Sequence, residues 1–256
     1  MNINIKDYNI NYIDEGKGNV VLLLHGWGAS LNSFTNLINL LKSSYRVLAI
    51  DFPGFGDSDK LKKSFSVDDY TDIVVDFLEK LNVKDVILVG HSYGGRVILK
   101  LNNRENLPFT INKNVLIDAA GLKDKKDFKT KFKIFTFKSL KKLVFLLPIS
   151  DSKKDSMTIS LRRKFGSSDY KNSDSIMQET LVRSVNEDLK NCLPKMRETL
   201  IIWGSNDTVT PMWMAKYMEK NISNSGLVVL NGGHFSFIDD PITFLKVIKY
   251  YFKLNE

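Results

Sequence analysis

Short, continuous runs of apolar residues recur along this chain of 256 residues. Val20–Leu24 is such a run, and Arg46–Ile50 and Val86–Val89 repeat its pattern, which is typical of strands buried on both faces. Between the last two runs, apolar side chains from Tyr70 to Leu81 recur at the period of an α-helix. Strands that alternate with helices predict an α/β fold, with a mostly parallel, twisted sheet and helices on both of its faces.

Further elements extend this pattern toward both ends of the chain. Asn2–Lys6 and Asn9–Asp14 alternate apolar and polar residues and predict a half-exposed hairpin. A last helix is expected to begin near Pro241, with Asp239 or Asp240 as its N-cap. Three more buried strands are predicted, at Val115–Ile117, Leu200–Trp203 and Leu227–Leu230.

The alternation of strands and helices breaks in the middle of the chain, in residues 121–193. This stretch has helical patterning, is rich in lysine and contains no convincing strand. Because it lies between two strands of the sheet, we expect a helical cap over the carboxyl ends of the strands, where open α/β sheets bind ligands. The domain prediction is therefore a core of residues 1–120 and 194–256, with residues 121–193 as an inserted cap.

Composition and charge narrow the class of protein. The net charge is +8, but residues 122–175 hold 15 basic and 6 acidic side chains, so the rest of the chain carries a net −1. A nucleic-acid binder is not expected to confine its charge to one segment. Apolar runs are too short to span a bilayer, residues 1–14 do not resemble a signal peptide, and a single cysteine fits a reducing compartment. We therefore expect a cytoplasmic protein without a membrane anchor.

The sequence Gly-His-Ser-Tyr-Gly-Gly at residues 90–95 carries the strongest chemical signal. It satisfies the pattern G-x-S-x-G and lies between a predicted buried strand and an apolar-periodic helix, Val97 to Leu101. Glycines two positions on either side of Ser92 permit a sharp turn from strand to helix. The serine is then exposed at a helix N-terminus, where the helix dipole favours an alkoxide or an oxyanion. Ser92 is the candidate nucleophile.

A nucleophilic serine needs a base, and the chain has only three histidines. His91 adjoins the serine and is expected to point away from it. His25 ends the first buried strand. His234 follows a strand in a loop that begins with two glycines, so it is the histidine that can place an imidazole over Ser92. His234 is the candidate general base.

The base needs a carboxylate to orient it, and two strand ends offer one. Asp207 lies in a turn just after the strand Leu200–Trp203, and the order Ser92, Asp207, His234 is the order expected for this architecture. Asp118, at the end of Val115–Ile117, is the alternative acid. No C-x-x-C, H-E-x-x-H or cluster of spare histidines is present, so neither a metal site nor a cofactor is expected.

With these motifs, the chain resembles the α/β-hydrolase superfamily. The resemblance covers every segment except the cap, and it assigns the oxyanion hole to the backbone N–H groups of Trp27 and Tyr93. It implies that His25 is a structural hydrogen-bonding residue. Related dehalogenases and epoxide hydrolases carry Asp where this chain has Ser92, which argues against both activities. The motifs also resemble those of esterases that demethylate a carrier-bound dicarboxylate.

The basic cap leaves two interpretations open. Phe132 and Phe135 fall on one helical face within residues 128–147, and several lysines surround that face. One interpretation is a lid whose apolar side lines the substrate pocket, with solvated lysines. The other is attraction of an anionic partner, either an acidic carrier protein or a membrane surface.

The sequence therefore predicts a serine hydrolase that cleaves small-to-medium carboxylic esters through an acyl-enzyme intermediate, with a small-molecule ester as its partner. Two alternatives remain. One is hydrolysis of another acyl bond, in a lactone, a thioester, a carrier-bound methyl ester or a C–C substrate. The other is a non-catalytic ligand sensor on the same fold.

Overall fold

A computed structural model describes most of the chain. The described residues are 1–123, 136–137, 139–140, 142–150, 152–154, 156–158, 160, 170 and 173–254. In this part of the chain, eight strands form one sheet in the order β1-β2-β4-β3-β5-β6-β7-β8. The strands are β1 (Asn2–Ile5), β2 (Tyr8–Glu15), β3 (Val20–Leu24), β4 (Arg46–Ile50), β5 (Asp85–His91), β6 (Thr110–Ile117), β7 (Thr199–Gly204) and β8 (Ser225–Leu230).

The sheet is parallel from β4 to β8, and the antiparallel hairpin of β1 and β2 extends it at one end. The predicted α/β fold and hairpin are confirmed. Helices and 3₁₀ turns connect the strands, at η1 (Leu31–Phe34), α1 (Thr35–Leu41), α2 (Val67–Lys80), α3 (Tyr93–Asn103), α7 (Ser175–Asn186), η2 (Lys190–Lys195), α8 (Met212–Asn221), α9 (Ser236–Asp239) and α10 (Pro241–Phe252).

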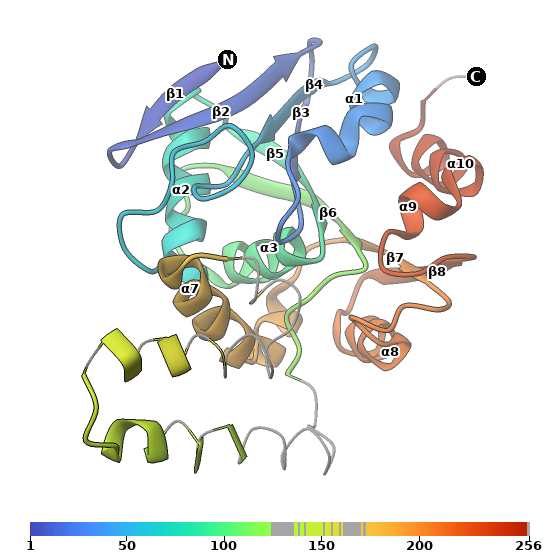
Figure 1. Ribbon diagram of the computed structural model, residues 1–256. Coiled ribbons are helices and arrows are strands. Elements are labelled where there is room, and N and C mark those ends of the chain that lie inside the picture. Colours follow the sequence, from blue (N-terminus) through green and yellow to red (C-terminus); the bar gives the residue numbers. More distant parts are fainter. Residues whose placement is uncertain are drawn as a thin grey trace.

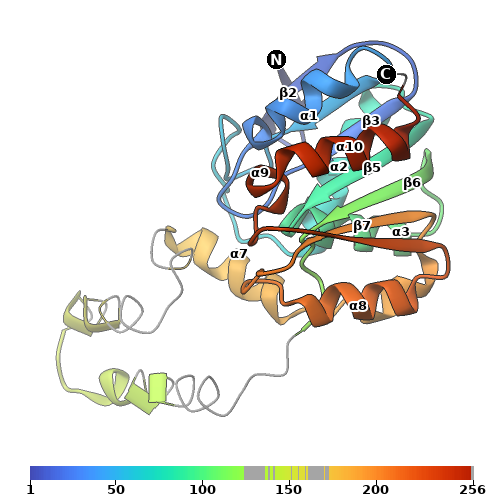
Figure 2. The same cartoon turned by 90° about the vertical axis from the view of Figure 1, so that its right-hand side faces the viewer.

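Helices cover both faces of the sheet (Figures 1 and 2). On one face, α2, α3 and α8 contribute side chains such as Val74, Leu99 and Met218 to a single buried cluster. On the other face, α1, α9 and α10 form a second cluster, which includes Phe237 and Ile248. The two-sided cover explains why β3, β4 and β5 are almost continuously apolar, since neither face of these strands meets water.

The start of each long helix follows from its local sequence. Ser66 caps α2 in a capping box, because its hydroxyl accepts from the backbone N–H of Asp69 while the Asp69 carboxylate accepts from the backbone N–H of Ser66. Asp240 caps α10 by accepting from the backbone N–H of Thr243. Asp239, the other predicted cap, instead accepts from the backbone N–H of Gly233 in the loop that carries His234.

One strand differs from its prediction. The run Leu227–Leu230 was expected to be buried on both faces, but in β8 only Leu230 is fully buried, and Val229 is 49% exposed. The reason is its position, because β8 is the last strand of the sheet and pairs only with β7 among the described strands. Apolar content therefore identified a strand here and did not show that it lies at an edge.

The end of residues 121–193 packs firmly on the core. Thr180 in α7 accepts a hydrogen bond from the backbone N–H of Phe65 at 3.0 Å, and the carbonyl of Glu187 accepts from Nη1 of Arg96 in α3 at 2.9 Å. The described parts of residues 136–160 are largely helical and lie beyond α7, away from the sheet (Figure 2). No helix in the described ranges is both long enough and apolar enough to cross a membrane.

Candidate active site

Ser92 lies in the sharp turn between β5 and α3, as its sequence motif predicts. Its backbone is strained, with φ of 47° and ψ of −105°, a region that residues with a side chain rarely adopt. The flanking glycines make the turn possible: a Cβ on Gly90 would lie 2.6 Å from the carbonyl carbon of Gly94, and one on Gly94 would collide with the carbonyl of Leu24. The turn therefore presents the serine side chain at the N-terminus of α3.

The structure brings the three candidate triad residues together. The Nε2 atom of His234 lies 2.9 Å from the hydroxyl of Ser92, and its Nδ1 lies 2.8 Å from Oδ2 of Asp207. Ser92 follows β5, Asp207 follows β7 and His234 follows β8, so three strand ends converge on one point at the carboxyl edge of the sheet. This hydrogen-bonded chain can move a proton from the hydroxyl of Ser92 to the imidazole.

Asp207 is held in place by the turn that follows it. Its Oδ1 accepts from the backbone N–H groups of Val209 at 2.8 Å and Thr210 at 2.9 Å, and the Thr210 hydroxyl donates to Oδ2 at 2.6 Å. Burial raises the pKa of the Asp207 carboxyl, but the bonds from His234 and Thr210 outweigh this and hold the pKa below its usual value. Asp207 is therefore an ionised acceptor for the histidine. Thr210 is not among the residues expected from the sequence, because only the folded turn brings its hydroxyl to Asp207.

Asp118, the alternative acid, has other partners. Its Oδ1 accepts from the backbone N–H of Gly204 at 2.8 Å, and its Oδ2 accepts from the backbone N–H and hydroxyl of Ser236 at 3.0 and 2.7 Å. Burial raises its pKa to about 6 against these bonds, and the nearby Asp207 adds to the rise. Among the described contacts Asp118 makes none with the His234 ring. It ties the end of β6 to the end of β7 and to α9.

His25 uses both of its ring nitrogens in hydrogen bonds, whereas His91 uses one, because its buried Nδ1 has no partner among the described residues. Nδ1 of His25 donates to the carbonyl of Gly26 at 2.7 Å, and its Nε2 accepts from the backbone N–H of Phe52 at 3.0 Å. Nε2 of His91 donates to the backbone carbonyl of His234 at 2.8 Å. Burial lowers the pKa of His91 to about 3, so its ring is neutral at working pH.

The position of His91 corrects one expectation. We expected this ring to point away from the site, but it packs against the ring of His234 with centroids 5.1 Å apart and anchors the loop that carries it. The physical reason is the sharp turn at Ser92, which leaves the preceding side chain under the neighbouring loop. No pattern in the sequence indicates this contact.

The backbone groups of the candidate oxyanion hole lie close to the serine and have no other acceptor among the described residues. A Cβ on Gly26 would lie 2.7 Å from Nδ1 of His91 and 3.2 Å from Cβ of Ser92, so the backbone before Trp27 passes directly beside the nucleophile. Tyr93 begins α3, where the first N–H groups of a helix have no partner inside the helix. Among the described residues, no acceptor bonds the backbone N–H of Trp27 or Tyr93.

A cavity of about 290 Å³ opens beside Ser92. It lies between α3, α7 and the loop before α8, and its walls include Trp27, Leu181, Val185 and Met214. Such apolar walls suit an acyl chain or a similar small group. Phe132 and Phe135, the predicted pocket residues, lie outside the described residues.

Within the described ranges, no group of three His, Cys, Asp or Glu side chains is arranged to hold a metal ion. The lone cysteine, Cys192, is free and buried in η2, and burial raises the pKa of its thiol. A buried thiol with a raised pKa is a packing residue rather than a nucleophile.

Comparison with known proteins agrees with this fold. Residues 21–247 match the model of a family described as the alpha/beta hydrolase family. Two solved structures superpose over nearly the whole chain. One is Est816, an N-acyl homoserine lactone degrading enzyme (TM-score 0.76, 21% identity, 98% of this chain and 100% of that one). The other is the esterase EaEST of Exiguobacterium antarcticum (TM-score 0.73, 25% identity, 96% of each chain).

Relatives of similar length carry several activities. The hydrolase YugF of Bacillus subtilis is 28% identical, over 87% of this chain and 85% of its own. The pimeloyl-[acyl-carrier protein] methyl ester esterase of Wigglesworthia glossinidia brevipalpis is 26% identical, over 93% and 95%. A 2-hydroxy-6-oxo-6-(2'-aminophenyl)hexa-2,4-dienoic acid hydrolase of Metapseudomonas resinovorans is also 26% identical, over 94% and 87%.

A parallel sheet with convergent strand-end loops and a serine on a strained strand-to-helix turn defines a hydrolase of the α/β type. The chain belongs to the alpha/beta hydrolase family.

Proposed function

We propose that this protein is a serine hydrolase that cleaves small-to-medium carboxylic esters through an acyl-enzyme intermediate. The observation that carries the proposal is the continuous hydrogen-bonded chain from Asp207 through His234 to Ser92. A strained, glycine-flanked serine that bonds to a histidine, with an ionised carboxylate behind it, is the arrangement that activates a hydroxyl for attack on a carbonyl.

The reaction then proceeds in two balanced halves. Oγ of Ser92 attacks the ester carbonyl while its proton passes to Nε2 of His234. The tetrahedral intermediate collapses, the proton passes from His234 to the departing alcohol, and the acyl group remains on Ser92. In the second half a water molecule gives its proton to His234 and attacks the acyl carbon, and the same proton returns to Ser92 as the carboxylic acid leaves.

The negative charge that forms on the carbonyl oxygen is stabilised by fixed dipoles. In this proposal the backbone N–H groups of Trp27 and Tyr93 donate to the oxygen, and the N-terminus of α3 adds the positive end of its dipole. Asp207 holds the Nδ1–H tautomer of His234 and stabilises the imidazolium that forms in each half-reaction.

Other acyl bonds suit the same machinery, and the relatives show the range. The substrates in their names are a methyl ester of an acyl-carrier protein, a hexadienoic acid and an N-acyl homoserine lactone. Hydrolysis of such a lactone, thioester or C–C substrate is the second candidate activity. A ligand sensor that retains the triad would bind these compounds without turning them over, and steady-state hydrolysis of a p-nitrophenyl ester separates the two.

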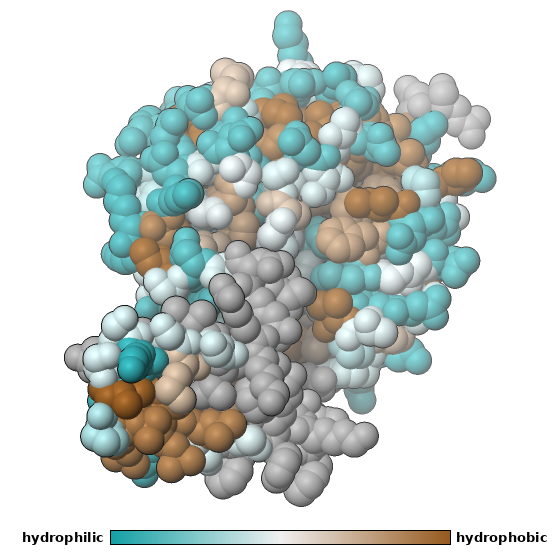
Figure 3. All heavy atoms as spheres, in the orientation of Figure 1, coloured by the Kyte–Doolittle hydropathy of each residue, from teal (hydrophilic) through white to brown (hydrophobic). Residues whose placement is uncertain are grey.

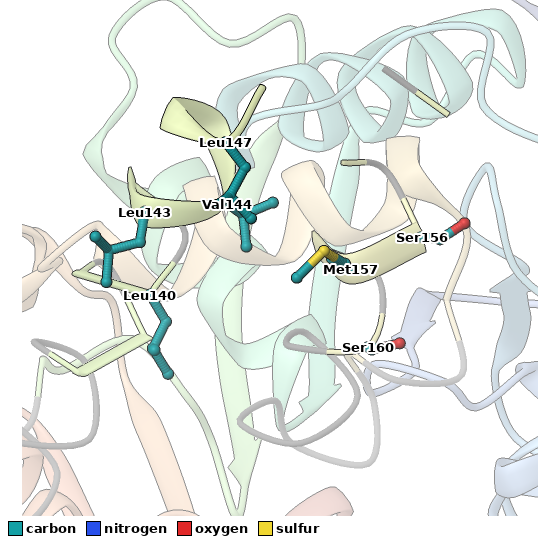
Figure 4. Close-up of a pocket in the computed structure, with 7 residues that line it drawn as sticks. All are labelled: Leu140, Leu143, Val144, Leu147, Ser156, Met157 and Ser160. Carbon is teal, nitrogen blue, oxygen red and sulfur yellow. The ribbon is translucent and has the colours of Figure 1, made fainter. Parts of the chain in front are cut away.

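We assign residues 121–193 as a cap on a core of residues 1–120 and 194–256. In the described part of the cap, Leu143 is 58% exposed and Leu146 71% exposed, and apolar spheres cluster there in Figure 3. A further cavity of about 500 Å³ lies between Leu140, Val144 and Met157 (Figure 4). With its lysines, this surface suits an acidic carrier protein or an anionic surface.

The single buried cysteine suits a cytoplasmic location.

The nucleophile assignment has a direct test. A fluorophosphonate probe forms a covalent bond with an activated serine, and digestion followed by mass spectrometry locates the modified residue. We expect one labelled peptide, with the probe on Ser92. Labelling of another serine, or none in a protein that hydrolyses p-nitrophenyl esters, would contradict the assignment. The proposal also predicts that the His234→Ala variant is not labelled, because its serine lacks a base.

A further inference from the structure

A cation lies deep in the wall of the cavity that contains Ser92. Arg96 is the fourth residue after Ser92 in α3, and its backbone N–H bonds to the carbonyl of Ser92 at 3.4 Å. The two residues therefore lie on one face of the helix, a single turn apart. Arg96 is only 5% exposed, yet it lines the cavity together with Ser92 and Tyr93.

The guanidinium of Arg96 has few partners among the described residues. Its Nη1 donates to the carbonyl oxygen of Glu187 at 2.9 Å, and no described carboxylate forms an ion pair with it. The nearest carboxylates are engaged elsewhere, because Glu187 pairs with Lys100 at 2.7 Å and Asp188 pairs with Lys190 at 3.2 Å. Burial accordingly lowers the pKa of Arg96.

Arginine side chains are rarely buried without a carboxylate partner, since removing a charge from water is costly. Several N–H donors of Arg96 remain for a ligand, in a planar fork that matches the two oxygens of a carboxylate. The arginine is therefore poised to bind an anion that enters the cavity.

The charge of the remaining cavity wall agrees with this interpretation. Lys123 is the other charged residue in the described lining, and its Nζ donates to the carbonyl of Asn186 at 3.3 Å. None of the described residues that line the cavity is Asp or Glu. A neutral substrate would gain nothing from two cations, whereas an anionic one is attracted to the cavity and repelled by nothing in its wall.

Two hydroxyls complete the polar part of the wall. The hydroxyls of Tyr93 and Ser184 lie 3.1 Å apart and share one hydrogen bond. They carry two protons between them, so whichever hydroxyl donates to the other, one proton remains for an acceptor in the cavity. Arg96 and this hydroxyl pair thus form a group of donors on one side of Ser92.

We propose that Arg96 binds a carboxylate of the substrate, so that this enzyme prefers esters that carry a free carboxylate a short distance from the scissile bond. The inference rests on the proposed function, because it deepens the substrate class of the same site. Arg96 acts here by binding and orientation and takes no part in proton transfer.

Two pairs of isosteric esters test the preference in a pH-stat assay. Monomethyl glutarate and methyl pentanoate differ only by a carboxylate in place of a methyl group on the acyl side. The acetate ester of 4-hydroxybutanoate and butyl acetate differ in the same way on the alcohol side. We expect the wild-type protein to show a higher kcat/KM for the anionic member of at least one pair, and the pair that responds identifies the side that Arg96 holds.

The Arg96→Gln variant tests the residue. We expect the ratio of kcat/KM between the anionic and the neutral ester to fall by about thirty-fold or more, as when one partner of a buried charge pair is truncated. Arg104→Gln is the matched control, because it removes the same charge at the C-terminal end of α3, at a side chain that pairs with Asp68 and Asp72 and does not line the cavity. That control is expected to keep the wild-type ratio.

Further measurements distinguish loss of the carboxylate site from misfolding of the variant and from failure of the proposed serine hydrolase activity. Circular dichroism checks that Arg96→Gln is folded, and Arg96→Lys, which keeps the charge but loses the planar fork, is expected to give an intermediate ratio. Calorimetry with Ser92→Ala measures whether monomethyl glutarate binds more tightly than methyl pentanoate, independently of turnover.

The outcomes are distinct. Neutral esters hydrolysed as well as anionic ones in both pairs, or an unchanged ratio in folded Arg96→Gln, would overturn the carboxylate site while leaving the serine hydrolase intact. Tighter binding of the anionic ester to Ser92→Ala, with no hydrolysis by the wild-type protein, would support the site and contradict the proposed activity.

Discussion

The carboxyl edge of the sheet and the middle of the chain treat their side chains in opposite ways. At the sheet edge, polar groups are buried and satisfied: Asp51, Asp118 and Asp207 each accept several hydrogen bonds from neighbouring loops. In the described part of residues 136–160, apolar side chains face water, as at Leu146 (Figure 3). Hydrogen bonds hold the side chains of the first region in fixed positions, whereas the exposed apolar side chains of the second region are free to contact other molecules. We therefore expect changes at the sheet edge to affect the chemistry, and changes in residues 121–193 to affect the choice of acyl chain.

The largest expected effect is removal of the nucleophile. Ser92→Ala eliminates the attacking atom, and we expect kcat for a p-nitrophenyl ester to fall by about 10⁴- to 10⁶-fold. The variant is expected to fold like the wild-type protein, because Ser92 contributes no cap bond to α3. Wild-type turnover by a folded Ser92→Ala protein would place the chemistry outside the sheet edge.

The next effect separates the two buried aspartates. Asp207→Asn replaces the ionised acceptor of the His234 Nδ1–H by a neutral amide, which can hold the wrong tautomer of the histidine, and we expect a loss in kcat of about 10⁴-fold. Asp118→Asn leaves the triad intact but removes one of the carboxylate oxygens that accept from the Gly204 and Ser236 donors. It is therefore expected mainly to lower the free energy of unfolding, by about 1–3 kcal/mol. Steady-state kinetics and urea unfolding on both variants check the ranking. The reverse order in kcat would move the acid to the end of β6.

Asp118 also predicts a pH dependence of stability. Its pKa is about 6 in the folded protein, above the ordinary value of 3.8, so the folded state retains the proton while the unfolded chain has lost it. Its contribution to stability is therefore fully present below pH 3.8 and is lost as the pH rises through about 6, by about 2–3 kcal/mol. The difference in the free energy of unfolding between wild type and Asp118→Asn, measured from pH 4 to pH 7, should show this slope. A flat difference would contradict it.

Changes in the cap are expected to alter selectivity and leave the rate of chemistry intact. Phe132→Ala and Phe135→Ala should change the preference among acyl chain lengths by about 1–3 kcal/mol in kcat/KM, the range for an apolar contact in a pocket. A series of p-nitrophenyl esters from acetate to octanoate measures this preference. An unchanged profile in both variants would show that these residues do not line the pocket.

The smallest effect is expected from the cap lysines. Replacing Lys138, Lys141 and Lys142 with glutamine should leave kcat/KM for small neutral esters almost unchanged, because solvated charges contribute little at physiological salt. The same variant should associate more slowly with an acidic carrier protein or with anionic vesicles, and added salt should reduce the difference. If neither neutral esters nor anionic partners respond, the lysines form only a solvated surface.

The sequence was sufficient for most of the core, since apolar runs and helix caps are local signals. The motif around Ser92, together with the scarcity of histidines, was also sufficient to select the three residues that the structure brings together. What it missed depends on contacts between distant segments. One example is the hydrogen bond from the His91 ring to the carbonyl of His234, and another is the burial of Arg96 beside Ser92. Both form only when β5, α3 and the loop after β8 come together in the fold. Exposure of β8 is likewise a property of its place in the sheet.

The chain order of the triad has a consequence for breaking the molecule in two. Ser92 precedes the inserted residues, whereas Asp207 and His234 follow them, and β6 pairs with β7 directly across the gap, from Asn114 with Thr199 to Ile117 with Ile202. A cut between residues 123 and 173 therefore divides the machinery between two fragments whose contacts in the intact chain include the pairing of β6 with β7. Hydrolysis by the mixed fragments would report their reassembly, so the protein could serve as a split reporter.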